Sequence, residues 1–107
     1  MDRPSLVLRA TRDADAATLT VSGEIDMATA ESLYERACGL VDAPARRLLL
    51  DLRGVTFCDS VGLAVLVRIY RYATAADCRL RLANLHPHVA YTLHISGLDQ
   101  VLEVEPA

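Results

Sequence analysis

The sequence predicts one small α/β domain with a mostly parallel sheet, an antiparallel N-terminal edge hairpin and about three to four helices. Its 107 residues fit a single domain, and a hydrophobic content of 52% is ample for a core. Near the N-terminus, apolar residues recur with the two-residue period of strands. Further along the chain, segments with the helical period alternate with strands. We therefore expect one domain over residues 1–107, with two strands followed by alternating helices and strands.

The N-terminal region predicts a hairpin and then a helix. Leu6 to Arg9 is a short candidate strand, and after a turn Thr18 to Glu24 alternates apolar and polar residues. Asp26 or Thr29 is placed to cap a helix that runs to about Val41. The residues expected on the buried side of this helix are Ala30, Leu33, Ala37 and Leu40.

The middle of the chain predicts the core strand. RRLLLDL is apolar on both faces, which is typical of a central parallel strand covered by helices on both sides. A turn is expected at Arg53 and Gly54, after which Val55 to Cys58 leads into a second helix from about Ser60 to Thr74. The expected buried stripe of this helix is Leu63, Leu66, Val67 and Tyr70.

The C-terminal third predicts a strand, a helix and a short final strand. RLRLAN alternates leucine with arginine, which indicates a fourth strand with its leucines inward. Pro87 marks the first turn of a helix, and Gly97 ends that helix. Val101 to Val104 is a candidate last strand.

Composition argues against several functions. A formal net charge of -3 gives no reason to expect nucleic acid as a partner. No apolar run suggests a signal or a membrane span, so we expect a cytoplasmic protein without a membrane partner. The three cysteines form no metal-binding pair, and no metal or cofactor is expected. Without lysine, a GxxxxGK loop or GxSxG, phosphate-loop, Schiff-base and serine-hydrolase chemistries are disfavoured.

One polar pair, Asp59 and Ser60, interrupts the apolar stretch VTFCDSVGLAVL. In the simplest interpretation it only caps the second helix, a role worth about 1 kcal/mol. A helix N-terminus also offers unpaired N–H groups and a partial positive charge, so a phosphoryl group on Ser60 would be tolerated there. Phosphoserine carries about 1.5 to 2 negative charges, and beside Asp59 it would repel a protein that docks on this patch.

The segment LLLDLRGVTFCDSVGLAVLVRIYR resembles the signature of the STAS domain family, and in particular of the bacterial anti-sigma factor antagonists. VSGEIDMATAESL and HPHVAYTLHISGL extend the resemblance along nearly the whole chain. It implies a protein without catalysis of its own. The unphosphorylated form binds an anti-sigma factor that is also a serine kinase, which frees the sigma factor. The kinase, with its own ATP, inactivates the antagonist, and a PP2C-type phosphatase restores it.

The resemblance also implies roles for individual residues. Ser60 is the implied phosphoacceptor. The family often has serine or threonine where this chain has Val61, so Ser60 is the only hydroxyl left in the motif. Asp26 and Thr29 are expected at the same edge of the sheet, although ordinary helix capping explains them equally well. The implied partner-binding residues are Asp26, Thr29, Asp59, Ser60, Val61, Gly62 and Leu63.

Two other functions stay open. A STAS domain could be a constitutive adaptor of an ABC-type lipid transport complex or of a signalling assembly, with Ser60 only a helix cap. A small enzyme is the third alternative and has the least support in the sequence. The exposure of Ser60 and its modification by a kinase separate the first two interpretations.

Overall fold

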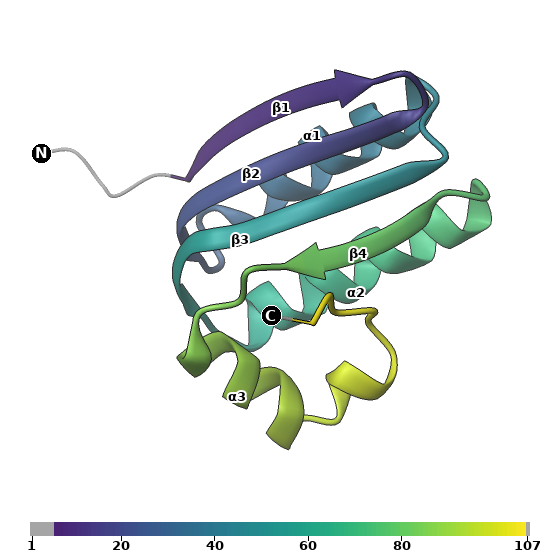
Figure 1. Cartoon of the computed structure of the whole chain (residues 1–107). Helices are drawn as coiled ribbons and strands as arrows, with labels where there is room; N and C mark the ends of the chain where they lie inside the picture. Colours follow the sequence, from purple (N-terminus) through teal and green to yellow (C-terminus); the bar gives the residue numbers. More distant parts are fainter. Residues whose placement is uncertain (1–5, 107) are drawn as a thin grey trace, which may run out of the picture.

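A four-stranded sheet and three α-helices are built by residues 6–106, the part of the chain that the computed structural model describes (Figure 1). The elements are β1 (Val7–Asp13), β2 (Ala16–Ile25), α1 (Ala30–Asp42), β3 (Arg47–Cys58), α2 (Ser60–Ala75), β4 (Arg79–Ala83), α3 (Pro87–Ile95) and the 3-10 helix η1 (Leu98–Gln100). In the strand order β1-β2-β3-β4, β1 and β2 are antiparallel and the other two pairs are parallel. The predicted fold class is confirmed.

The N-terminal hairpin is longer than predicted. Its strands continue to a turn of two residues, Ala14 and Asp15, and Asp13 lies opposite Ala16. Ala14 adopts the left-handed conformation, with φ 55°, which fits the first position of a tight hairpin turn. The alternation predicted for β2 is confirmed, because Leu19 is buried while Thr18 is half-buried on the opposite face.

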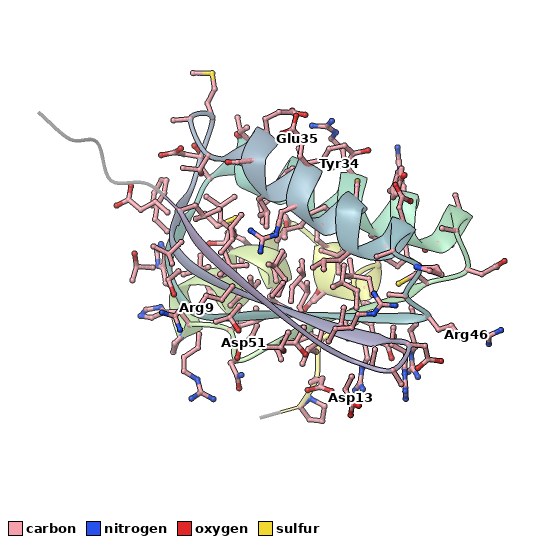
Figure 2. All side chains as sticks on the ribbon, turned by 90° about the horizontal axis from the view of Figure 1, so that it is seen from above. Arg9, Asp13, Tyr34, Glu35, Arg46 and Asp51 are labelled. Carbon is pink, nitrogen blue, oxygen red and sulfur yellow. The ribbon has the colours of Figure 1, made fainter. Side chains whose placement is uncertain are left out.

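Helices α1 and α2 both cover one face of the sheet and pack against each other (Figure 1). The expectation that helices would cover both faces was wrong. Crossovers between parallel strands are right-handed in nearly all proteins, and β2, β3 and β4 follow one another in one direction, so both helices fall on the same side. In Figure 2, Arg9, Asp13 and Asp51 lie on the face opposite to the helices.

The core lies between the sheet and these two helices, and their predicted buried sides were partly wrong. On α1, Val41 is buried, whereas Leu40 is only half-buried. On α2, Leu66 alone of the expected stripe is fully buried, because the helix is rotated relative to the prediction. The fully buried residues of α2 are Gly62, Val65, Leu66, Ile69 and Ala73. No helix among residues 6–106 is long and apolar enough to cross a bilayer.

The turn predicted at Arg53 and Gly54 does not occur, because β3 runs unbroken from Arg47 to Cys58. Instead, the register between β2 and β3 shifts twice, between Thr20 and Ser22 and between Gly23 and Glu24. These irregularities act as β-bulges, which re-aim side chains locally. Beyond them, the buried positions of β3 are Leu52, Val55 and Cys58, three residues apart instead of two.

The C-terminal segment makes less of a strand than predicted. Pro87 begins α3, and Gly97, with φ 77°, follows its end, as expected. Between Val101 and Val104, only Val104 pairs with the sheet, through an isolated parallel bridge to Leu82. Arg79 and Arg81 of β4 pair with Glu103 and Glu105 of this segment, and Arg79 lowers the pKa of the Glu103 carboxyl.

We predict that Gly54→Ala destabilises the domain by about 1–3 kcal/mol. A Cβ at this position would lie 2.3 Å from Ser22 Oγ and 2.8 Å from Ser22 Cβ. Urea unfolding of Gly54→Ala, Ser22→Gly and the double variant measures the coupling. The loss caused by Gly54→Ala should be smaller in the Ser22→Gly background, and strictly additive losses would contradict a steric cause.

Candidate functional site

The candidate site lies where the carboxyl ends of β2 and β3 meet the starts of α1 and α2. The start of α2 can approach β2 only because residue 62 is glycine. A Cβ on Gly62 would lie 2.6 Å from the backbone oxygen of Ile25 and 2.7 Å from Cys58 Sγ. The backbone N–H of Asp59 also donates to the Ile25 oxygen, over 3.4 Å. This close packing brings the β2–α1 loop next to the Asp59-Ser60 pair.

Asp59 is the N-cap of α2, as the sequence suggested for this pair. Its backbone is extended, and its Oδ1 accepts a hydrogen bond of 3.0 Å from the N–H of Gly62. Its backbone oxygen accepts the N–H of Leu63 over 2.9 Å. The cap therefore occupies one carboxylate oxygen and fixes the first turn of α2.

Ser60 is the first helical residue, and its side chain is exposed. Within residues 6–106, neither its hydroxyl nor the backbone N–H groups of Ser60 and Val61 have a hydrogen-bond partner. The hydroxyl is thus accessible at a helix N-terminus, where unpaired N–H groups favour negative charge. Because Asp59 does the capping, Ser60 is not needed as a helix cap.

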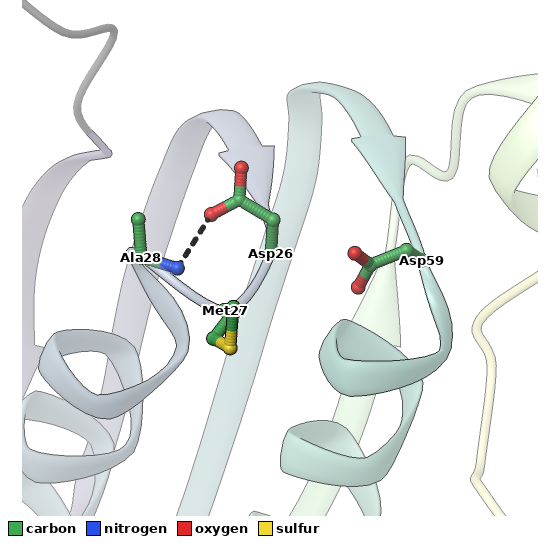
Figure 3. A pocket seen from close by; sticks show the side chains of 4 residues that line it. All are labelled: Asp26, Met27, Ala28 and Asp59. Carbon is green, nitrogen blue, oxygen red and sulfur yellow. Dashed lines mark hydrogen bonds between the residues drawn. The ribbon is translucent and has the colours of Figure 1, made fainter.

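The loop between β2 and α1 is held by Asp26 and Thr29 in a way that the sequence did not predict. Asp26 Oδ1 accepts the N–H of Ala28 over 2.9 Å (Figure 3), and the Asp26 backbone oxygen accepts that of Ala30 over 2.8 Å. Thr29 Oγ1 donates to the backbone oxygen of Glu24 over 2.7 Å and accepts the N–H of Asp26 over 3.0 Å. Thr29 occupies the predicted N-cap position of α1, but its side chain makes no capping hydrogen bond to the helix.

Exposed apolar side chains stand around this position. Met27 is 81% exposed, Phe57 42% and Val61 40%, and they come from three segments that meet at this end of the sheet. Met27 and Phe57 were not among the residues predicted for this surface. Met27 is an apolar residue in a loop, which was a usable signal. The exposure of Phe57 agrees with simple alternation along β3, in which Leu48 and Leu50 are buried. Contiguous exposed apolar area with a polar rim is typical of protein-binding surfaces.

Asp26, Met27, Ala28 and Asp59 together line a depression beside Ser60 (Figure 3). Neither Asp26 nor Asp59 takes part in an ion pair within residues 6–106. In the same part of the chain, no group of three or more His, Cys, Asp or Glu residues is arranged to hold a metal ion. The surface beside Ser60 therefore carries two carboxylates that form no ion pair with any residue in the described part of the chain.

The structure brings the residues implied as partner-binding to this one end of the domain, but it exposes them unequally. Ser60 and Val61 are exposed, and Asp26 and Asp59 are partly exposed. Thr29 is only 7% exposed. The residues that shape the interior of the site are Thr29, Gly62 and Leu63, since Gly62 is buried and Leu63 is half-buried against the core.

Cys58 lies directly below this surface and is buried. Burial, and secondarily the charge of Asp59, raises the pKa of its thiol to about 11. At neutral pH the thiol is therefore protonated, and a protonated thiol is a poor nucleophile. This environment fits a structural role for Cys58.

Comparison with known proteins gives a consistent result. Residues 8–103 match the family model described as "Mlab, STAS domain". An anti-sigma-B factor antagonist of Listeria monocytogenes is 30% identical over 94 residues, which cover 88% of this chain and 82% of that protein. The family resemblance noted in the sequence is thereby confirmed.

Solved structures share the whole fold. A crystal structure of an anti-sigma factor antagonist from Mycobacterium paratuberculosis superposes with a TM-score of 0.84 at 27% identity, over 95% of this chain and 86% of that one. The Bacillus cell fate determinant SpoIIAA, in its phosphorylated form, superposes with a TM-score of 0.70 at 17% identity, over 94% and 92% of the two chains. At that identity, the second match concerns the fold alone.

We predict that Gly62→Ala destabilises the domain by about 1–3 kcal/mol, because the added methyl group meets the Ile25 backbone. Gly39→Ala is the matched control. It also adds a methyl group inside a helix, but nothing lies within 4 Å of that position, so it should stabilise by about 0.5–1 kcal/mol. Urea unfolding measures both. A neutral Gly62→Ala would contradict the close contact.

We also predict that Cys58 resists alkylation in the folded protein. A pKa of about 11, against 9.0 for an ordinary thiol, leaves about a hundredfold less thiolate at neutral pH. Iodoacetamide labelling followed by mass spectrometry, with the urea-unfolded chain as control, measures the rate at Cys58 from pH 7 upward. The rate in the folded chain should still be rising beyond pH 9, and a plateau there would contradict the raised pKa.

Proposed function

We propose that this chain, which belongs to the STAS domain family, is an anti-sigma factor antagonist whose partner binding is controlled by phosphorylation of Ser60. The unphosphorylated protein binds an anti-sigma factor that is also a serine kinase. Phosphorylation by that kinase ends the complex, and a PP2C-type phosphatase restores it. The domain, proposed to span residues 1–107, performs no catalysis itself and acts in the cytoplasm. The kinase, and not this domain, binds the ATP that supplies the phosphoryl group.

The observation that carries this proposal is the exposed hydroxyl of Ser60, which has no hydrogen-bond partner among residues 6–106 and lies within a partly apolar surface. A kinase must reach the hydroxyl, and an antagonist must offer a docking surface around it. Met27, Phe57 and Val61 supply exposed apolar area on that surface. Such area contributes about 25 cal/mol for each Å² that a partner buries.

The charges around Ser60 support an electrostatic switch. Asp26 and Asp59 already make this surface negative, and phosphorylation adds about 1.5 to 2 negative charges to it. A partner that tolerates two carboxylates meets roughly double that charge after modification. The same position at a helix N-terminus keeps the phosphorylated domain folded, because unpaired N–H groups stabilise an anion.

The relatives support the same proposal. The Listeria protein is named an anti-sigma-B factor antagonist, and SpoIIAA, which has the same fold, occurs in a phosphorylated form. Asp26, Asp59, Val61 and the two neighbouring residues Gly62 and Leu63 are proposed to form the partner-binding surface. Thr29 contributes to it by holding Asp26 in place.

We predict that Ser60→Ala stays folded and binds the cognate kinase permanently, while Ser60→Asp binds at least about tenfold more weakly, a loss of about 1.4 kcal/mol. Each anti-sigma kinase encoded near the gene is incubated with ATP and the wild-type chain, and mass spectrometry identifies the modified residue. Titration calorimetry then measures the affinity of each variant for every one of these kinases that binds the wild-type chain, whether or not it modifies Ser60.

Thr74→Asp is the matched control for added charge. Thr74 is exposed near the opposite end of α2, about 21 Å from Ser60 at about 1.5 Å per helical residue, so its replacement should leave binding unchanged. If no kinase modifies Ser60 and Ser60→Asp binds as tightly as wild type, the switch is refuted. A constitutive adaptor would then be the better explanation.

A further inference from the structure

The outer edge of β1 has no neighbour among residues 6–106 (Figure 1). The charged side chains of β1 complement those of a second copy that is related to it by a two-fold rotation. Side chains alternate along β1, so Arg9, Thr11 and Asp13 lie on the open face of the sheet. All three are exposed. Arg9 and Asp13 form no ion pair with any described residue.

We propose that two copies of this chain associate through antiparallel pairing of their β1 edges, with Thr11 on the two-fold axis. In this register, Arg9 of each copy lies opposite Asp13 of the other. The two-fold rotation therefore creates two ion pairs between Arg9 and Asp13 and one contact between the two Thr11 side chains, all on the open face. Cross-strand pairs of opposite charge and of two threonines stabilise antiparallel pairing. The arrangement is isologous, as in most homodimers.

The backbone pattern of β1 allows this register. Asp13 and Ala16 flank a two-residue turn, so they form a hydrogen-bonded pair, and the odd-numbered residues of β1 direct their backbone groups to β2. The backbone groups of Leu8, Ala10 and Arg12 consequently point to the free edge. With Thr11 on the axis, Ala10 pairs with Arg12 of the other copy, and Arg9 and Asp13 occupy non-hydrogen-bonded positions, where side chains are closest.

Neighbouring registers lack this match. Moving the axis to Arg9 or to Arg12 places two arginines directly opposite each other, and moving it to Ala10 sets Arg9 against Thr11 and Asp13 against Val7. Charges on an edge strand usually prevent pairing of edges. In β1, the arginines disfavour pairing centred on Arg9 or on Arg12. The charges of Arg9 and Asp13 favour pairing centred on Thr11.

The dimer is weak and leaves the Ser60 surface free. A ladder of about five residues buries less than the 1,200–2,000 Å² typical of specific, stable interfaces, so association depends on concentration. Thr11 pairs with Thr18, and Ile25, at the Ser60 end of β2, lies seven positions further on, about 23 Å away at about 3.3 Å per residue. The proposal is therefore independent of the proposed function.

Sedimentation equilibrium from micromolar to millimolar concentration tests the pairing. The wild-type mass should rise toward that of a dimer, and less so at high salt. Arg9→Asp and Asp13→Arg should each raise the dissociation constant at least about tenfold, because like charges then face each other, and the double variant should return it toward the wild-type value. Arg46→Asp, at an exposed position outside β1, is the control for charge reversal and should associate as the wild type does.

Circular dichroism verifies that every variant is folded. Hydrogen exchange provides a second readout, since the amides of Ala10 and Arg12 should gain protection as concentration rises. A wild-type chain that stays monomeric at millimolar concentration overturns the proposal. The proposal is also overturned if either single variant associates as tightly as wild type. A folded double variant whose dissociation constant does not return toward the wild-type value overturns it too.

Discussion

The contact between Gly62 and the end of β2 is the constraint on which the rest of the site depends. Because no side chain stands between them, the first turn of α2 lies against the Ile25 backbone. The helix start is thereby fixed relative to two strands at once, since Asp59 follows β3 directly and also donates to Ile25. The positions of Asp59, Ser60 and the β2–α1 loop all follow from this contact.

The order of the parallel strands is the second constraint. Two successive right-handed connections in one direction place α1 and α2 on the same face, so the starts of both helices and the ends of β2 and β3 gather at one end of the domain. Among residues 6–106, no helix covers the opposite face, which is largely polar. An open face and an uncovered β1 edge are therefore consequences of the same topology that builds the Ser60 surface.

Much of the fold could be predicted from the sequence, because its strands and helices have clear periods and clear ends. Leu80 and Leu82 alternate with arginine, and Pro87 and Gly97 delimit α3 as predicted. The errors have physical causes that periodicity does not contain. Glycine at position 54 indicated a turn, but it is required by the close approach of Ser22 on the neighbouring strand, which is a tertiary contact.

The residues of the candidate site could likewise be predicted only in part. Asp59 and Ser60 could be located from the sequence because a polar pair interrupts an apolar stretch, and the structure assigns the cap to Asp59. Phe57 was missed because a turn was predicted at Gly54, which interrupted the alternation. Continued from Leu48 through the unbroken β3, the same alternation gives Phe57 an exposed position. Thr29 has a residue type typical of a helix cap, but its hydroxyl binds the Glu24 backbone oxygen and so connects the loop to β2.

Asp59 caps α2 and Ser60 does not, which explains how a modification of Ser60 would act on a partner with little effect on the fold. Asp59 supplies the hydrogen bond that α2 needs, so a phosphoryl group on Ser60 removes no structural contact. The unpaired N–H groups of the first turn offset part of the added charge, by about 0.3–1 kcal/mol at an exposed helix end. The two carboxylates oppose it by amounts of similar size, since all these groups are partly solvated. Because these internal effects nearly cancel, the added charge is felt mainly by a protein that would exclude water from this surface, where electrostatic repulsion is much stronger.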